Sequence, residues 1–340
     1  MKTSSVYKYG NDVIWSLPCL FQYEVVFGAI QSTLQELEFQ PLNANIFGSP
    51  ATNWSSGRAP VVVDKLEKRQ LKKIFNYIQN THKGAPSFTF SKIEISKDEL
   101  KSEYENYILD LAIETGARFI VSSDRLKDYI KEKSPNSVVV ASILKPIYRY
   151  QGKTKLEEAT PEGESEYYNK LLKEYDIVVA RPEYTKDVLV YHPELIDDIS
   201  RIEVLINQIC TSNCPSAPIH YNILQKSHIE DIEQEKMYCY KTLYSPIQKY
   251  TLNSAHTEEE VKKLIEYGVR HLKLQGRGEK VSHLRNTFFL ASQIFNFDGA
   301  NNLFAIMLMN DALRNEYKKF SAIVDPQGLW NFQNSSEGLV

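Results

Sequence analysis

Residues 118–143 read RFIVSSDRLKDYIKEKSPNSVVVASI and contain one complete unit of the predicted fold. The first and last parts, Arg118–Ser122 and Val138–Ile143, are short runs rich in β-branched residues, which is the pattern of buried strands. Asp124–Glu132 between them is an amphipathic stretch typical of a helix. A strand, a helix and a second strand in this order indicate parallel strands joined by a right-handed crossover.

The same alternation continues over almost the whole chain. Further strands are predicted at Asp12–Leu17, Ala44–Gly48, Ser87–Ser91, Asp176–Arg181, Arg201–Asn207 and His271–Gln275. Further helices are predicted at Leu20–Leu37, Asp64–Gln79, Lys97–Glu114, Ser165–Glu174, Thr185–Ile199 (interrupted at Pro193) and Thr257–Tyr267, with one or two more between His283 and Lys318. Eight such units most economically close into a (β/α)8 TIM-like barrel, although a doubly wound open sheet has the same alternation.

The composition is that of a globular protein. The chain has 340 residues, is 42% hydrophobic and 24% charged, and carries a formal net charge of −3. No apolar run reaches the roughly 18 residues of a membrane span, and the N-terminus lacks the pattern of a signal peptide, so we expect a cytoplasmic protein that does not bind membranes. The charge balance argues against a broadly basic surface that coats nucleic acid, but it allows a local basic groove.

We expect a single barrel domain over residues 1–334 and a loose tail at residues 335–340. An insertion at about residues 208–256 separates the seventh strand from the eighth. This insertion contains most of the cysteines, so its position relative to the barrel decides where they act. In a barrel of this class, the chemistry takes place where the strands run out into the loops that follow them.

The cysteines are the strongest functional signal. Four are too few for a disulfide scaffold in a chain of this length, and thiols stay reduced in the cytoplasm. Cys210 and Cys214 follow the seventh strand, and Cys239 lies later in the same insertion. Thiolates select zinc, cuprous copper or iron–sulfur clusters, although buried, inert cysteines are a common alternative. Cys19 ends the first strand, which neighbours the eighth in a closed barrel, and is therefore a possible fourth ligand.

Other polar residues also follow predicted strands. His220 lies six residues beyond Cys214 and is a candidate ligand or acid–base group. Glu203 shares a face of the seventh strand with Asn207, while Lys273 on the eighth strand shares a face with the residues Gln275 and Arg277. Arg277 and Lys273 are suited to hold a carboxylate or phosphate. The alternative for Glu203 and Lys273 is a buried ion pair between neighbouring strands that only stabilises the barrel.

A loop after the second strand, Asn53-Trp54-Ser55-Ser56-Gly57-Arg58, has the composition of a substrate-binding loop. It offers an amide at Asn53, an aromatic platform at Trp54 and a guanidinium at Arg58. The alternative for Trp54 is a side chain that covers the rim or bottom of the barrel.

Two motifs resemble those of the collagenase-like peptidase superfamily. The first is Glu203-Val204-Leu205-Ile206-Asn207 followed by Cys-x3-Cys-Pro and a histidine before Tyr221; the second is Gly268-Val269-Arg270-His271-Leu272-Lys273-Leu274-Gln275-Gly276-Arg277. Tyr244-Ser245-Pro246 is similar to the family's connection between them. This resemblance covers about Arg201–Arg277 and departs from the family pattern at Gln275, which stands in place of an acidic residue, and in the spacing of the cysteines.

The resemblance implies a TIM-like barrel and, in several members, four cysteines that hold a [4Fe–4S] cluster. Those members carry out oxygen-independent hydroxylation, ubiquinone synthesis or reactions on RNA bases, and others are classed with the peptidases. The leading hypothesis is therefore an enzyme whose cysteines (Cys210, Cys214 and Cys239, with Cys19) hold such a cluster, or zinc, for redox or hydroxylation chemistry. The alternatives are a peptidase that uses Cys210 and His220, and a non-catalytic barrel that serves a protein partner. The substrate class, whether small molecule, peptide or RNA, stays open.

Overall fold

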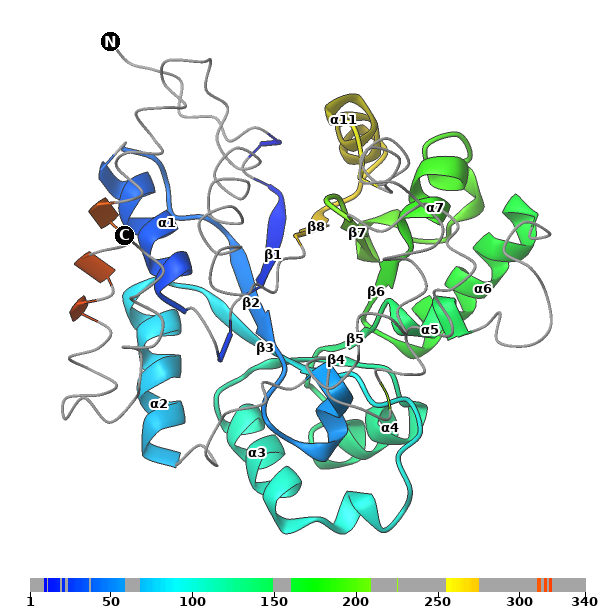
Figure 1. Cartoon of the computed structure of the whole chain (residues 1–340). Helices are drawn as coiled ribbons and strands as arrows, with labels where there is room; N and C mark the ends of the chain where they lie inside the picture. The colour runs from blue at the N-terminus through cyan, green and yellow to red at the C-terminus, as the bar shows by residue number, and fades with distance from the viewer. Residues whose placement is uncertain are drawn as a thin grey trace, which may run out of the picture. The chain divides into compact units, whose positions relative to one another are not determined.

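The fold was analysed in a computed structural model of the chain (Figure 1). The structure describes residues 9–10, 12–18, 20–21, 24–36, 38–58, 68–148, 160–208, 225, 255–274, 311–312, 315–316 and 318–319. The part of residues 208–256 that holds Cys210, Cys214 and Cys239 lies outside this set, as does the tail at residues 335–340.

Eight parallel strands form a closed barrel in chain order, which confirms the predicted fold class. The strands are β1 (Ile14–Pro18), β2 (Ala44–Gly48), β3 (Ala85–Phe90), β4 (Arg118–Val121), β5 (Val139–Ala141), β6 (Ile177–Ala180), β7 (Ile202–Leu205) and β8 (His271–Lys273). Each strand begins within two residues of the first residue predicted for it. The alternation of short apolar runs with amphipathic stretches was therefore sufficient to locate the strands of the barrel.

Helices connect the strands, as the crossover rule requires (Figure 1). The longer helices are α1 (Glu24–Glu36), α2 (Lys68–Asn76), α3 (Glu103–Glu114), α4 (Asp124–Lys133), α6 (Pro161–Glu174) and α11 (Glu258–Glu266). The shorter turns are η1 (Asn53–Arg58), η2 (Tyr77–Thr81), η3 (Glu99–Lys101), α5 (Leu144–Tyr148), α7 (Pro182–Tyr184), η5 (Thr185–Leu189), η6 (Pro193–Leu195) and η7 (Ile199–Arg201). None of the described helices combines the length and the apolar character needed to cross a membrane.

Two predicted helices are divided in the structure. The stretch 97–114 begins at Ser96, whose hydroxyl accepts a hydrogen bond from the backbone N–H of Glu99 at 3.1 Å, but only η3 follows. Ser102 then has extended backbone angles (φ −61°, ψ 126°), so the continuous helix α3 starts at Glu103. The stretch 185–199 breaks before Pro193, as predicted, because proline lacks the N–H that a helix interior needs.

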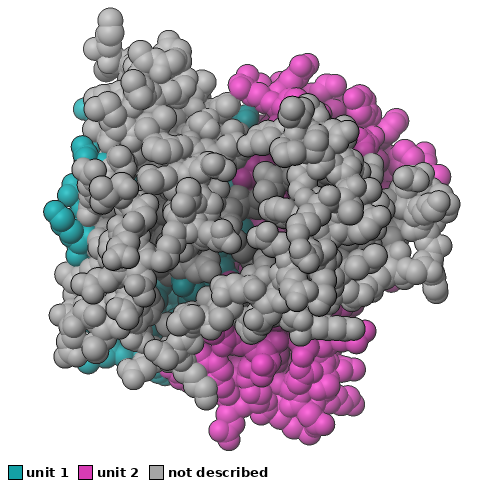
Figure 2. All heavy atoms as spheres, viewed as in Figure 1, with its two compact units in different colours: residues 1–48, 66–86, 274–340 teal, residues 49–65, 87–273 magenta. Residues whose placement is uncertain are grey.

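The contacts within the chain define two compact units (Figure 2). The first comprises residues 1–48, 66–86 and 274–340, and it contains β1 and β2. The second comprises residues 49–65 and 87–273, and it contains most of β3 together with β4 to β8. The polar residues that are most relevant to function belong to the second unit.

The first unit contains a tightly packed polar cluster around Glu316. Its carboxylate accepts hydrogen bonds from the hydroxyl of Tyr77 at 2.8 Å and from Ser32 at 3.1 Å, and lies 3.0 Å from His82 Nε2. Gly28 of α1 lies against this cluster, and a Cβ added there would be 1.9 Å from the Tyr77 hydroxyl. A glycine is therefore required at this contact by lack of space, not by backbone conformation.

Candidate functional site

The inner face of β3 is lined by hydroxyl groups. Its sequence from Ser87 to Ser91 reads SFTFS, which alternates hydroxyl and phenylalanine side chains with the period of a strand. Phe90 packs edge-on against Trp54 at 5.6 Å between ring centroids, and Trp54 also contacts Tyr129 of α4. The phenylalanines thus face the helices, so the hydroxyl side chains face the interior of the barrel.

These hydroxyl groups are buried without hydrogen-bond partners among the described residues. Thr89, Ser91 and Ser122 are each at least 95% buried, and none of their hydroxyl oxygens has such a partner. Ser91 and Ser122 follow the paired positions Phe90 and Val121, so they stand side by side where β3 and β4 end. The interior of a TIM barrel is usually filled by large branched side chains, and hydroxyl groups here are a departure from that pattern.

A buried ion pair joins the next-to-last strand to the last. Lys273 of β8 donates a hydrogen bond to Glu203 of β7 at 2.8 Å, and the two side chains are 10% and 1% exposed. The positions of the two residues on neighbouring strands had suggested this pair as the alternative to a functional role for them. Because β7 and β3 lie four strands apart in a ring of eight, this pair and the hydroxyl face of β3 occupy opposite walls of the interior.

Two amide side chains lie near carboxyl ends of strands, Asn207 after β7 and Gln225 beside the end of β3. Asn207, which follows β7, is 7% exposed, in agreement with its predicted inward face. Gln225, a residue of the long insertion after β7, bonds to the backbone just beyond β3. Its side chain donates to the carbonyl of Ser91 at 3.0 Å and accepts from the N–H of Ile93 at 3.0 Å. At Gln225 the insertion is therefore attached to the end of β3.

His256 is a residue that the sequence analysis passed over. Its backbone N–H donates to the carbonyl of Ile206 at the end of β7, and its Nε2 lies 2.7 Å from the hydroxyl of Thr185. Burial lowers the pKa of His256 to about 4, so the imidazole is neutral near pH 7. Its Nδ1 is buried and has no hydrogen-bond partner among the described residues. Only the fold brings Thr185 and His256 together, since no local sequence signal links them.

The loop after β2 does not present Trp54 as the aromatic platform for a substrate that its sequence suggested. Trp54 is completely buried, and its indole N–H donates to the carbonyl of Glu99 at 3.3 Å. Its ring packs edge-on against Phe90 and Tyr129, so Trp54 is a packing residue between the strands and α4 and not an exposed aromatic platform. Asn53 is exposed, with its backbone N–H bonded to Glu105 at 2.9 Å. Arg58 ends η1, and its side chain lies outside the described part.

The predicted metal ligands are not among the described residues. These are Cys19, Cys210, Cys214, Cys239 and His220, and the predicted residues Gln275 and Arg277 also lie outside. Within the described ranges, no three histidine, cysteine, aspartate or glutamate side chains are grouped so that they would hold a metal ion. The donor set itself fits a soft metal, because three thiols within one insertion offer the sulfur ligands that iron–sulfur clusters and zinc require.

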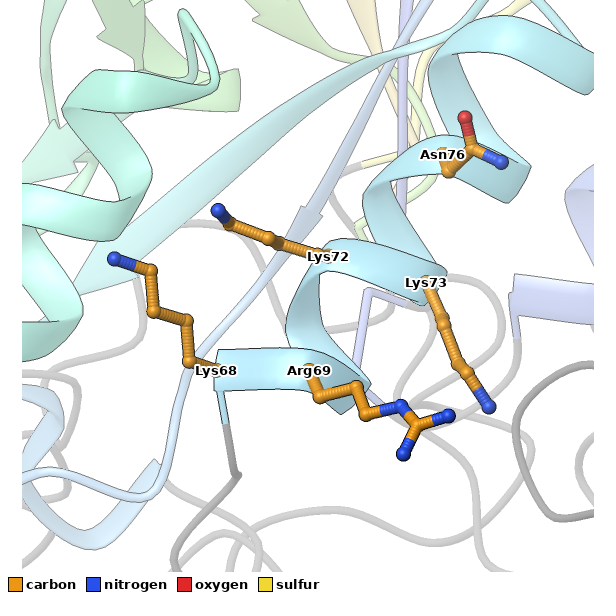
Figure 3. Close-up of a pocket in the computed structure, with 5 residues that line it drawn as sticks. All are labelled: Lys68, Arg69, Lys72, Lys73 and Asn76. Atoms are coloured by element: carbon orange, nitrogen blue, oxygen red, sulfur yellow. The ribbon is translucent and has the colours of Figure 1, made fainter.

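A separate open hollow of about 680 Å³ lies along α2 (Figure 3). Its lining residues all come from this one helix and are Lys68, Arg69, Lys72, Lys73 and Asn76. Four of the five carry a positive charge, so the hollow is a local basic patch of the first unit. It contributes no carboxylate, thiol or imidazole.

Comparisons with known proteins leave the chain without an assigned relative. No protein-family model matches it, and no curated protein matches it significantly. The functional conclusion consequently depends on the barrel, its interior and the sequence.

Proposed function

We propose that this protein is a barrel enzyme whose cysteines hold an iron–sulfur or zinc centre and which carries out redox chemistry, in particular oxygen-independent hydroxylation. The observation that carries the proposal is the polar interior of the barrel in the second unit. Thr89, Ser91 and Ser122 present hydroxyl groups that have no hydrogen-bond partner in the described part of the chain, opposite the buried pair of Glu203 and Lys273.

A polar interior of this kind destabilises a fold. A buried polar group without a partner costs about 1–3 kcal/mol, and a buried ion pair is often no more stable than apolar side chains of similar size. Proteins retain such groups mainly where function requires them. The carboxyl ends of parallel barrel strands are also where the active sites of this fold lie, which supports an enzyme over a purely structural barrel.

The cysteines supply the second part of the proposal. Cys210 comes two residues after Gln208, where the described segment 160–208 ends, so the Cys210–Cys214 pair follows the carboxyl end of β7 in sequence. We propose Cys210, Cys214 and Cys239 as the ligands, with Cys19 as the fourth. When bound, an iron–sulfur centre supplies electron transfer or a Lewis-acid iron.

The side chains of the barrel have their own roles in this proposal. Lys273 keeps the Glu203 carboxylate charged and oriented by a charge-assisted hydrogen bond. Glu203 can then accept a proton from a substrate at the interior end of the site, and Asn207 can orient a polar substrate group with its amide. His220 and Arg277 complete the proposed set as an acid–base group and a carboxylate or phosphate clamp, and Gln275 as a substrate contact.

We further propose that the chain is a divergent member of the collagenase-like peptidase superfamily. The motifs at Glu203–Asn207 and Gly268–Arg277 support this assignment, and the barrel agrees with the fold that the family implies. A cluster-free peptidase is the functional alternative within the same superfamily.

Anaerobic purification followed by metal analysis and absorption spectroscopy tests the proposal. We expect a brown protein with broad absorption in the visible range, and about tenfold less bound iron in the Cys210→Ala and Cys214→Ala variants. Ser142→Ala, at a residue outside the cysteine segment, serves as the control and should keep its iron. A colourless protein without iron or zinc after anaerobic handling contradicts the metal centre, and proteolysis abolished by thiol alkylation would favour the peptidase.

A further inference from the structure

The charges on the barrel strands do not balance. Across the eight described strands, the only charged side chains are Arg118 on β4, Glu203 on β7 and Lys273 on β8, and His271 on β8 is the only histidine. With His271 neutral, two positive charges therefore face one negative charge. Burying a net charge is unfavourable unless a counter-charge accompanies it.

One carboxylate next to the strands also attracts Arg118. This is Asp176, which directly precedes β6. Burial lowers the pKa of Arg118, and the carboxylates of Glu203 and, to a smaller extent, Asp176 oppose this effect. Its carboxylate is 43% exposed and already accepts hydrogen bonds from Lys131 at 2.9 Å and from the N–H of Val139 at 2.7 Å. Asp176 is therefore balanced mainly by Lys131, so it only partly balances the charge of Arg118.

The residues involved share the interior and one end of the barrel. Ser87 of β3 is paired in register with Arg118 of β4, and Glu203 of β7 is paired with His271 of β8. Alternation places Ser87 on the hydroxyl face of β3, so Arg118 beside it also faces inward. Arg118 and His271 are the first residues of their strands, and their position is thus the amino end of the interior, away from the carboxyl ends used by the proposed enzyme.

Three buried polar atoms in this place have no hydrogen-bond partner in the described part of the chain. They are the Nε of Arg118, the hydroxyl of Ser87 and the Nδ1 of His271. Ser87 is only 2% exposed, so solvent on the protein surface cannot satisfy its hydroxyl. The arginine nitrogen is a donor only, and the serine and imidazole groups can both donate. Buried donors of this kind beside the positively charged guanidinium of Arg118 are the elements of an anion site.

We propose that Arg118, Ser87 and His271 form a binding site for a small oxyanion at the amino end of the barrel interior. A phosphate or carboxylate group fits, because the planar guanidinium binds either one through two parallel hydrogen bonds. The bound anion provides a counter-charge for Arg118. This site involves none of the cysteines, and it lies beside Glu203 of the proposed reaction, which is paired in register with His271.

The titration of His271 gives a direct readout. Burial lowers the pKa of His271, Glu203 opposes this effect, and the positive charge of Arg118 adds to it. The other charged group that faces His271 from the strands is Lys273, and Asp176 lies next to Arg118. An anion bound between Arg118 and His271 counteracts the burial and the guanidinium, and so raises the pKa of His271.

The test uses the full-length protein, prepared anaerobically in chloride buffer. Calorimetric titration with inorganic phosphate measures the affinity, and titration with acetate at equal ionic strength tests the carboxylate. We expect saturable binding of at least one of the two, with affinity reduced about tenfold or more in Arg118→Gln and less in Ser87→Ala. Arg270→Gln is the matched control, because Arg270 lies at the same end of β8 but donates to the backbone carbonyls of Ile265 and Val269.

Nuclear magnetic resonance of the histidine ring protons completes the test. Saturating anion should move the pKa of His271 upward in the wild-type protein but leave it unchanged in Arg118→Gln. If Arg118→Gln does not fold, the Ser87→Ala and His271→Asn variants still report a weakened affinity. Absence of saturable binding of both anions, or equal affinity in the wild-type protein and the Arg118 and Ser87 variants, overturns the proposal and leaves water as the partner of these groups.

Discussion

At the scale of single residues, Gly28 is the position where the structure leaves least room. An added methyl group would overlap the Tyr77 hydroxyl at 1.9 Å and approach both Glu316 and His82 to 2.9 Å. We expect Gly28→Ala to lower the free energy of unfolding by about 1–3 kcal/mol, because the cluster must shift and its hydrogen bonds weaken. Chemical denaturation measures this change.

The control for Gly28 is Gly163→Ala in the first turn of α6. A Cβ at Gly163 meets only the Thr160 hydroxyl, at 3.3 Å, and alanine favours the helix. This variant should be as stable as the parent protein or slightly more stable. Equal stability of Gly28→Ala and the parent would show that the cluster around Glu316 is loosely packed.

His256 makes the stability depend on pH in a defined window. Its pKa is about 4 in the folded protein and about 6.5 in the unfolded chain, so the unfolded chain binds more protons between these values. The stabilisation is complete above pH 6.5 and is lost as the pH falls toward 4. Urea denaturation between pH 7.5 and 4.5 should show a loss on the order of 2 kcal/mol that is smaller in His256→Gln. An unchanged pH profile in that variant would assign the loss to other groups.

The residue scale also shows which parts of the site the sequence could predict. Glu203 and Lys273 lie on neighbouring strands, and the alternation of side chains along a strand places both in the barrel interior. This was enough to suggest their ion pair as an alternative to a functional role. Trp54 could be read as exposed or buried, because its environment depends on Phe90 and Tyr129, which are remote in sequence. His256 lies next to Thr185 only in the fold, and unpaired hydroxyl groups such as that of Thr89 cannot be recognised before their surroundings are known.

At the scale of elements, β3 has one apolar face and one face of hydroxyl groups, and both are buried. The phenylalanine face packs on helices, while the hydroxyl face is buried without partners among the described residues. We expect Thr89→Val to leave the stability unchanged or to raise it by about 1 kcal/mol, because valine has a similar shape and removes an unsatisfied group. If the hydroxyl face binds substrate, the same variant should lower the activity. Thermal unfolding and an activity assay together separate the two effects.

Thr185→Val is the comparison for Thr89→Val. The Thr185 hydroxyl donates to the carbonyl of Pro182 at 2.9 Å and lies 2.7 Å from His256. Removing it breaks both contacts, so this variant should lose about 1–3 kcal/mol. Similar losses in the two threonine variants would mean that Thr89 has a partner in solution.

Elements were predictable to different degrees for a physical reason. A strand of a parallel barrel is buried on both faces, so its apolar run stands out in the sequence. Helix boundaries depend on single capping residues. Thr257 forms a full capping box with Glu260 at the start of α11. Ser96 forms the same kind of cap, but the extended backbone of Ser102 ends the turn, and no local pattern announced that break.

At the scale of the whole molecule, the ion pair of Glu203 and Lys273 spans the last two strands of the ring. Lys273→Met or Glu203→Gln alone should cost about 3–5 kcal/mol, because each leaves a buried charge without its main partner. The double variant Glu203→Leu, Lys273→Met should be more stable than the sum of the single effects predicts, and it should be inactive if the proposed roles hold. A double-mutant cycle measured by denaturation gives the coupling, and strict additivity would contradict it.

The order of the strands has a consequence for the synthesis of this protein. β8 lies between β7 and β1, so the ring closes only when a strand near the start of the chain meets one that begins at His271. At about 5–20 residues per second, the ribosome needs roughly 10–50 s between these two points. During that time β1 and the most recently completed strand, finally β7, are open edges with unpaired backbone groups, which are prone to pair with other chains. The nascent chain is therefore most exposed to aggregation shortly before its last strand emerges, and that is the stage at which a chaperone would protect it most.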